Sequence, residues 1–140
     1  MTADLADRAR YGYWWRENIR FSDTDLVGHV NNVAYAALLE SGRTAFTHET
    51  RFPRSPANAQ VVMARIEIDY RRELHWPATV DIGSRITAIG NRSYRIGSGI
   101  FLGERCICTG LAVLVMIDRT TRRAVDLPDE YRAYLEQACR

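Results

Sequence analysis

The 140-residue sequence contains no lysine, and arginine supplies all 19 of its basic side chains. Acidic residues nearly balance them, so the formal net charge is only +2. A chain this close to neutral lacks the one-sign field that attracts nucleic acid or an anionic membrane. The sequence also lacks an apolar run of membrane-spanning length. We therefore expect neither a nucleic-acid partner nor membrane insertion.

Cysteine is scarce as well, with only Cys106, Cys108 and Cys139 in the sequence. An odd number at these spacings indicates neither a disulfide framework nor a zinc site. Cys106 and Cys108 are two apart in an expected strand, which predicts that both point to the same face of a sheet. We expect reduced thiols in a cytoplasmic protein that holds no metal or cofactor.

Residues 1–10 mix acids with arginines and lack the apolar stretch of a signal peptide. They are predicted to form a polar, loosely ordered lead-in. Residues 11–140 are enough for a single domain with its own core. The hydrophobic share of 46% and the charged share of 26% are ordinary for a globular protein.

Hydrophobic periodicity predicts a strand over 11–21, then a helix that begins at Asn31 or Asn32 and ends before Pro53. Strands follow over 61–70, 79–89, about 94–101 and 106–117, and Pro128 opens a short last helix. Strands joined by short turns are antiparallel. The pattern predicts an α+β fold: an antiparallel sheet of about five strands covered by one long helix, with a short C-terminal helix.

Apolar and small residues recur at three- and four-residue steps through the long helix, as in a helix that packs on one face. The predicted inward stripe consists of Val30, Val33, Ala34, Ala37, Leu38, Ser41 and Ala45. Its small members suggest a close approach to the neighbouring layer. The opposite face of the sheet is expected to stay open or to pack on a partner subunit.

The segment 20–35 concentrates polar chemistry just before the long helix: two acids, Asp23 and Asp25, then His29, and then Asn31 and Asn32. A helix start presents unpaired backbone N–H groups and a partial positive charge, so it can hold a developing oxyanion. A nearby carboxylate would then act on the electrophile bound there. The alternative is a purely structural role, in which the same residues cap the helix or lie in a solvated turn.

Residues 23–35 (Asp-Thr-Asp-Leu-Val-Gly-His-Val-Asn-Asn-Val-Ala-Tyr) resemble the signature of hotdog-fold acyl-CoA thioesterases of the 4-hydroxybenzoyl-CoA thioesterase type. The Gly-His-Val-Asn-Asn variant is closer to the long-chain acyl-CoA and acyl-ACP thioesterases than to the aromatic-substrate branch. The likeness extends over 62–70, 91–94 and 118–124, and it covers about 16–135. It implies one hotdog thioesterase domain over 11–140.

The resemblance implies that Asp25 is the catalytic carboxylate, either a nucleophile on the thioester carbonyl or a general base that activates water. The backbone N–H groups around Asn31 and Asn32 would polarise the carbonyl oxygen. The supporting residues would be Asp23 as a turn anchor, Gly28 as the turn and His29, which could share a hydrogen bond or a proton with Asp25. The substrate would be acyl-CoA or acyl-ACP, in fatty acid metabolism.

The family assembles as dimers or dimers of dimers with the active site at the subunit interface. A homotetramer is therefore among our expectations. Glu40 is either a surface ion-pair partner of Arg43 or a pocket acid. The CoA phosphates are assigned to Arg71, Arg72 and Arg92, since arginine suits phosphate groups.

Two other functions fit parts of the pattern. A hotdog-type enoyl-thioester hydratase or dehydratase would need an acid and a histidine, and Asp25 with His29 is the local pair that could serve. A non-catalytic module would bind an acyl thioester without cleaving it. Both remain alternatives to thioester hydrolysis at this stage.

Overall fold

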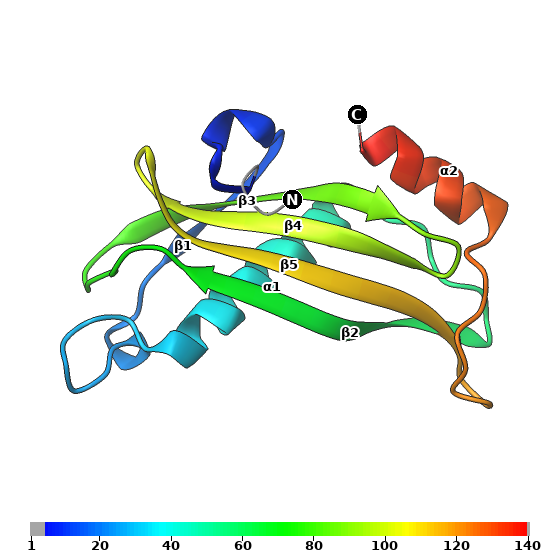
Figure 1. Ribbon diagram of the computed structural model, residues 1–140, viewed down its shortest axis with the longest axis horizontal. Helices are drawn as coiled ribbons and strands as arrows, with labels where there is room; N and C mark the ends of the chain where they lie inside the picture. The colour runs from blue at the N-terminus through cyan, green and yellow to red at the C-terminus, as the bar shows by residue number, and fades with distance from the viewer. Residues whose placement is uncertain (1–4, 140) are drawn as a thin grey trace.

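The computed structural model describes residues 5–139 and shows a single antiparallel sheet with one long helix across one face (Figure 1). The elements follow in the order η2 (Arg8–Arg10), β1 (Tyr13–Asn18), η3 (Phe21–Asp23), α1 (Asn32–Glu49), β2 (Ala59–Tyr70), β3 (Thr79–Ile89), β4 (Ser93–Leu102), β5 (Arg105–Asp118) and α2 (Asp129–Ala138). The strand order in space is β1-β3-β4-β5-β2. The predicted α+β architecture is confirmed.

The β2 to β5 strands lie where the sequence places them, but β1 is shorter than predicted. It covers Tyr13–Asn18 and pairs with β3 from Tyr13 opposite Ser84 to Asn18 opposite Thr79. At the other side of the sheet, β2 pairs only with β5. The sheet therefore has two edge strands, β1 and β2, and each pairs with a neighbour on one side only.

The buried face of α1 differs from the predicted stripe. Its buried members are Tyr35, Leu38, Leu39, Gly42 and Phe46. Val33 is instead 76% exposed, and Ala37 and Ser41 are also exposed. The larger apolar side chains set the rotation of the helix, because burial stabilises in proportion to the apolar area removed from water. The helix packs mainly on β1, β3 and β4, which leaves β2 less covered.

The N-terminal segment covers part of the opposite face of the sheet. Leu5 is 1% exposed, and the Tyr11 hydroxyl donates to the Leu5 carbonyl oxygen at 2.7 Å. A Cβ on Gly97 would come within 2.4 Å of the Leu5 side chain, so the bare glycine makes room for it. The prediction of a loosely ordered lead-in is therefore wrong for residues 5–10. Residues 1–4 lie outside the described range.

The two strand cysteines point to opposite faces, which corrects the prediction. Ile100 pairs with Cys108, but its neighbour Phe101 pairs with Cys106, so an irregularity in the ladder accommodates Ile107. Cys108 packs in the core beneath α1, whereas Cys106 packs with Phe101 on the other side. A β-bulge of this kind shifts the alternation of side chains by one residue.

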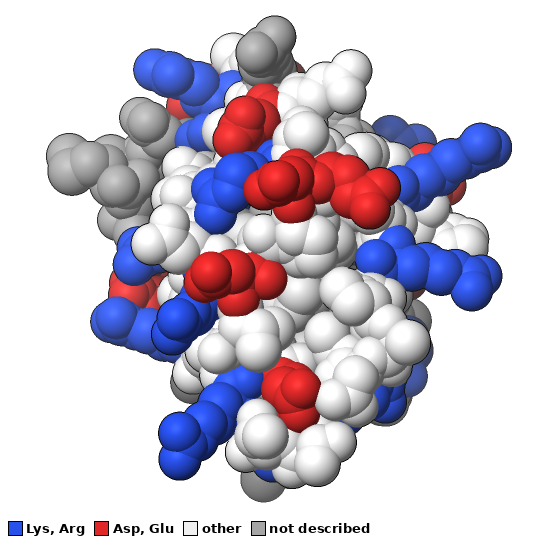
Figure 2. All heavy atoms as spheres, turned by 90° about the vertical axis from the view of Figure 1, so that its right-hand side faces the viewer, with Lys and Arg blue, Asp and Glu red and all other residues white. Residues whose placement is uncertain are grey.

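The end of the molecule that carries α2 is a packed aromatic cluster. Pro128 precedes α2, which agrees with the predicted start of the last helix. The side chains of Tyr131 and Leu135 are buried in the cluster. The hydroxyls of Tyr94 and Tyr131 are 3.0 Å apart, and the Phe52 ring contacts that of Phe46 with centroids 5.4 Å apart. The surface of this end carries arginines and acids interspersed, without a field of one sign (Figure 2).

Candidate active site

The segment between β1 and α1 forms a small hairpin that ends at the helix start. Thr24 and Val30 form an antiparallel bridge, and the Asp25 amide donates to the His29 carbonyl oxygen at 3.0 Å. The turn depends on Gly28, whose φ of +95° is unfavourable for residues with a Cβ. We call residues 24–30 the Asp25 hairpin. It holds Asp25 beside the first turn of α1.

Asp23 anchors the base of the Asp25 hairpin. Its carboxylate accepts the Arg20 amide at 2.8 Å and the Arg20 guanidinium at 2.9 Å, and its carbonyl oxygen accepts the Asn31 amide at 2.8 Å. Burial opposes ionisation of this carboxyl. The two Arg20 hydrogen bonds outweigh that effect, and the pKa of Asp23 lies below its usual range. With both carboxylate oxygens occupied, Asp23 has the bonding of a structural residue.

The first backbone amides of α1 are not equivalent. Asn31 is the N-cap: its side-chain oxygen accepts the Val33 amide at 2.9 Å, and its own amide donates to Asp23. The Ala34 amide donates to the Asn31 carbonyl oxygen. The Asn32 amide alone in this turn has no acceptor among the described residues. Of the two amides that the sequence suggests as oxyanion donors, only that of Asn32 is free.

Asp25 differs from Asp23 in keeping acceptor capacity. It is half-buried, and one carboxylate oxygen accepts the Val27 amide at 2.9 Å. Within residues 5–139 its other oxygen has no hydrogen-bond or ion-pair partner. The hairpin therefore presents a fixed carboxylate with one free oxygen, and the helix start that follows it presents a free amide.

A loop distant in sequence, residues 71–76, braces this hairpin. The Val30 amide donates to the Leu74 carbonyl oxygen at 2.8 Å, and His29 and His75 form a backbone bridge. Glu73 lies between the histidines, 3.7 Å from His29 and 3.6 Å from His75. No sequence pattern linked Glu73 or His75 to the hairpin, because the approach comes from the path of the β2–β3 connection.

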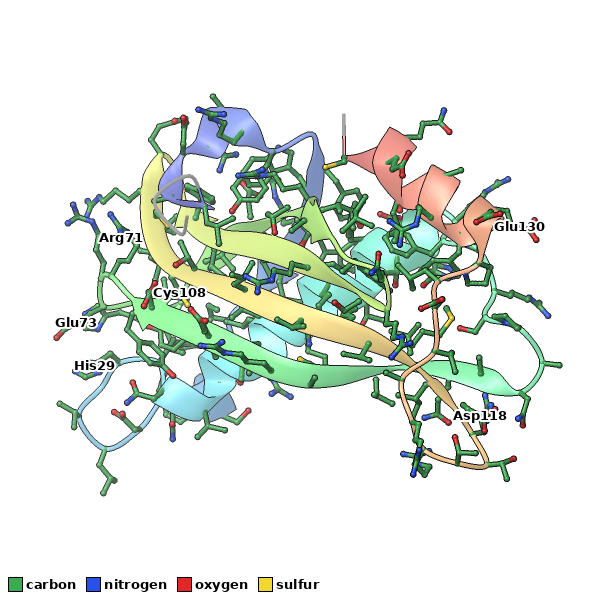
Figure 3. All side chains as sticks on the ribbon, turned by 45° about the vertical axis from the view of Figure 1, so that its right-hand side comes forward. His29, Arg71, Glu73, Cys108, Asp118 and Glu130 are labelled. Carbon is green, nitrogen blue, oxygen red and sulfur yellow. The ribbon has the colours of Figure 1, made fainter. Side chains whose placement is uncertain are left out.

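The expected side-chain pairing of Asp25 with His29 is absent from the described residues. The two are joined only through the backbone, and the His29 ring lies toward Glu73. In Figure 3 His29 and Glu73 lie at the same end of the molecule as Arg71. The hydratase alternative loses the acid–histidine pair on which it depended.

Two adjoining hollows lie next to the helix start. One, of about 230 Å³, is lined by His29, Val30, Asn32, Tyr35, Tyr70, Arg71, Arg72 and Glu73. The other, of about 630 Å³, shares Tyr70, Arg71 and Arg72 and adds Arg105. The hollows therefore join a narrow opening lined by Asn32 to a wider surface that carries three arginines and two acids, Asp69 and Glu104. Arg105 was not singled out from the sequence.

The other predicted site residues lie elsewhere. Arg92 forms an ion pair with Asp126 at 2.9 Å at the opposite end of the sheet from Arg71 and Arg72. Glu40 is exposed on the outer side of α1, in a hollow of about 440 Å³ that it shares with Trp15 and Glu17. Within residues 5–139 Glu40 forms no ion pair with Arg43.

The two strand cysteines are not activated as nucleophiles, since burial raises the pKa of both thiols, and the described residues contain no metal centre. Burial raises the pKa of the Cys108 thiol to about 12, so it stays protonated and unreactive at neutral pH. No group of three or more histidine, cysteine or acidic side chains in residues 5–139 has the geometry of a metal site. No helix within that range has the length and apolarity to cross a membrane.

The five-stranded antiparallel sheet with one long helix across one face is the hotdog fold, and the comparisons with known proteins identify the chain as a thioester hydrolase. The model of the thioesterase-like superfamily matches residues 19–135, and the chain belongs to that superfamily. It is similar to the long-chain acyl-CoA thioesterase FadM of Escherichia coli, with 29% identity over 123 residues that cover 85% of this chain and 93% of FadM.

Other relatives agree in fold. The uncharacterized protein YsmA of Bacillus subtilis is 26% identical over 131 residues, which cover 91% of this chain and 88% of YsmA. A Thermus thermophilus thioesterase, solved in complex with coenzyme A and Zn, is 28% identical with a TM-score of 0.79. That alignment covers 91% of this chain and 94% of the other. The PA5185 protein of Pseudomonas aeruginosa is 27% identical with a TM-score of 0.79, and 94% of each chain is covered.

Proposed function

We propose that this enzyme hydrolyses acyl-CoA thioesters, with Asp25 as the catalytic carboxylate and the Asn32 amide as the oxyanion donor. The observation that carries the proposal is that two groups of one short segment are free: one Asp25 oxygen on the hairpin and the Asn32 N–H at the start of α1. The Asp23 carboxylate oxygens and the backbone amides of Asn31 and Val33, by contrast, are occupied. A donor held in place before the reaction stabilises a developing oxyanion without reorganisation.

The chemistry needs little more than these two groups. The thioester carbonyl oxygen accepts from the Asn32 amide, and Asp25 either attacks the carbonyl carbon or removes a proton from the attacking water. Collapse of the tetrahedral intermediate expels the thiolate, which takes up a proton. By the nucleophilic route, an anhydride with Asp25 forms and water then cleaves it. Both routes give a carboxylic acid and a free thiol.

The arginine-lined hollow fits the CoA end of the substrate. The hollow begins at Tyr70 next to the helix start, and Arg71, Arg72 and Arg105 line it farther out. Guanidinium groups bind phosphate oxygens through paired hydrogen bonds. A phosphopantetheine-linked acyl carrier protein presents a single phosphate, so three arginines favour CoA. Fatty acid metabolism in the cytoplasm is the setting we infer.

A dimer would complete this site. Leu26, Val27 and Val33 are 106%, 74% and 76% exposed around the hairpin and helix start, and β2 has a free edge. Apolar side chains gathered beside a free strand edge suit an interface. If β2 pairs antiparallel with β2 of a second copy, the two subunits run in opposite directions. The end of the second copy that carries its Arg92 then lies toward the Arg71 end of this subunit. A monomer by light scattering at micromolar concentration would contradict the dimer.

The test of the activity is thiol release across acyl-CoAs of graded chain length and an aromatic acyl-CoA, with an acyl-ACP for comparison. In Asp25→Asn, kcat should fall a hundredfold or more, because acid–base catalysis alone typically supplies 10²–10⁴-fold. Asp129→Asn is the matched control, since Asp129 is exposed at the start of α2, away from the hairpin, and forms no hydrogen bond or ion pair through its side chain within residues 5–139. Full turnover by a folded Asp25→Asn protein would remove Asp25 from the mechanism.

A further inference from the structure

Tyr70 lies where the two hollows of the candidate active site meet. It is the last residue of β2, and it lines both the hollow of about 230 Å³ beside Asn32 and the hollow of about 630 Å³ that carries the arginines. Among the described residues the two hollows share Tyr70, Arg71 and Arg72, and Tyr70 is the uncharged member of the three. A ligand that reaches from the arginines to the helix start therefore crosses the surface that contains Tyr70.

The Tyr70 ring rests on a rigid support. Its backbone pairs with Cys108 of β5, and the two amides that follow it along the chain both donate to the Ile107 carbonyl oxygen, at 2.9 and 3.0 Å. The ring meets that of Tyr35 on α1 edge to face, with centroids 5.4 Å apart, and Tyr35 is itself only 4% exposed. A side chain supported by both the sheet and the helix presents a fixed surface to a ligand.

Much of the Tyr70 side chain nevertheless stays open. The residue is 52% exposed, and its hydroxyl donates to the Asn32 carbonyl oxygen at 3.2 Å, which is long for an O–H···O bond. The hydroxyl oxygen can also accept, but within residues 5–139 it receives no hydrogen bond. Packing in the fold accounts for the contact with Tyr35. It does not account for the exposed part of the ring or for the unused acceptor.

The order of chemical groups along this surface matches the order of groups in CoA. CoA begins with a nucleotide and its phosphates, continues through the uncharged pantetheine arm, which carries two amide groups between methylene groups, and ends at the sulfur. Along the hollows the arginines come first, Tyr70 follows, and the free Asn32 amide comes last. Methylene groups pack on an aromatic ring, and an amide N–H can donate to a phenol oxygen.

We propose that Tyr70 binds the pantetheine arm of CoA: its ring packs against the methylene groups of the arm, and its hydroxyl oxygen accepts one of the amide N–H groups. This inference rests on the proposed function, since it takes CoA as the ligand of the two hollows. It gives Tyr70 a part in binding and orienting the substrate and no part in cleaving the thioester.

Isothermal titration calorimetry of the full chain with CoA and with adenosine 3′,5′-bisphosphate tests the proposal without turnover. The bisphosphate retains the nucleotide and lacks the arm. Tyr70→Ala should weaken CoA binding roughly tenfold, because one hydrogen bond and the aromatic contact are lost, and should leave the affinity for the bisphosphate unchanged. Tyr70→Phe removes the hydroxyl alone and should weaken CoA binding roughly threefold.

Two control variants remove the same chemical groups outside both hollows. Phe21→Ala deletes an aromatic ring that is 71% exposed just before the Asp25 hairpin. Tyr13→Phe deletes a hydroxyl that donates to the Glu49 carboxylate at the other end of α1. Both variants should bind CoA as the wild type does.

Equal CoA affinity in the wild type and in a folded Tyr70→Ala protein would overturn the assignment, as would the absence of saturable CoA binding by the wild type. Equal losses for CoA and the bisphosphate would place Tyr70 at the nucleotide and overturn it too. If Tyr70→Ala fails to fold, Tyr70→Phe decides, and unchanged CoA affinity in that variant would overturn the hydroxyl contact. Tyr70-dependent CoA binding without thiol release would contradict the proposed hydrolysis and support this inference. Thiol release with CoA affinity independent of Tyr70 would do the reverse.

Discussion

The two ends of this molecule differ in how completely their side chains are buried and their polar groups are paired. At the α2 end, aromatic side chains are buried and the hydroxyls of Tyr94 and Tyr131 satisfy each other. At the hairpin end, Leu26 and Val27 are exposed, and one Asp25 oxygen and the Asn32 amide are left free. The first end is packed as a core, and the second leaves groups unpaired, which on the proposed function serve the substrate. Substitutions at the two ends should therefore separate stability from activity.

A loss of activity comparable to that of Asp25→Asn, without loss of fold, is expected from Asn32→Pro. Asn32 is the first helical residue, where proline is well accepted, and Asn31 before it has φ −64° and ψ 141°, a conformation compatible with a following proline. The variant removes one N–H and keeps the helix. Loss of one oxyanion donor typically costs 10²–10³-fold in kcat.

Asn32→Ala is the control for that experiment, because it removes the side chain and keeps the amide. It should retain most of the thiol-release rate. If Asn32→Pro hydrolyses acyl-CoA as fast as Asn32→Ala, another group holds the oxyanion.

At the other end, Leu135→Ala should reduce stability and leave the chemistry alone. Leu135 is fully buried, and removal of a buried leucine side chain costs about 2–5 kcal/mol of unfolding free energy. The same substitution at the fully exposed Leu26 should change monomer stability by less than about 0.5 kcal/mol. Urea unfolding of both variants measures the contrast. Similar losses at the two sites would mean that the ends are equally packed.

Acid should weaken the base of the Asp25 hairpin through Asp23. The folded-state pKa of Asp23 is depressed, so its ionised form stabilises the protein above the ordinary pKa of about 3.9. That contribution is lost as the pH falls through the folded-state pKa. At pH 6 the unfolding free energy of the wild type should exceed that of Asp23→Asn by about 1–2 kcal/mol, because the variant loses hydrogen bonds to a charged group. This difference in unfolding free energy, measured by urea unfolding, should narrow as the pH falls. A difference that stays constant down to pH 2 would contradict the stabilising role of ionised Asp23.

The smallest effect is expected from Gly28→Ala. A Cβ there meets no atom within 4 Å, so the cost comes only from the backbone at φ +95°, about 1 kcal/mol. Gly103→Ala is a matched control, because Gly103 also has positive φ and open surroundings, at the β4–β5 turn. Thermal unfolding should show similar losses in both. Only Gly28→Ala should also lower the thiol-release rate, since it alone displaces Asp25.

Local sequence was sufficient for the elements and for the outline of the site. Alternation predicted β3 at Thr79–Ile89, and the asparagine pair predicted the start of α1 at Asn31 or Asn32, because both signals lie in neighbouring residues. The order of Asp25, Gly28 and Asn32 along the chain predicted a turn between the carboxylate and the helix start. Its chemistry stays a prediction until the variants are assayed.

Tertiary structure decided what depends on contacts between distant segments. The buried face of α1 followed the larger side chains and left Val33 outside, and a bulge separated Cys106 from Cys108. The path of the β2–β3 connection places Glu73 next to the His29 ring. Sequence alone determined which groups are available near the helix start. Only the tertiary structure decided which of these groups form hydrogen bonds within the fold and which, like the Asn32 amide, remain free. The path of the whole chain determines which partners come within hydrogen-bonding distance.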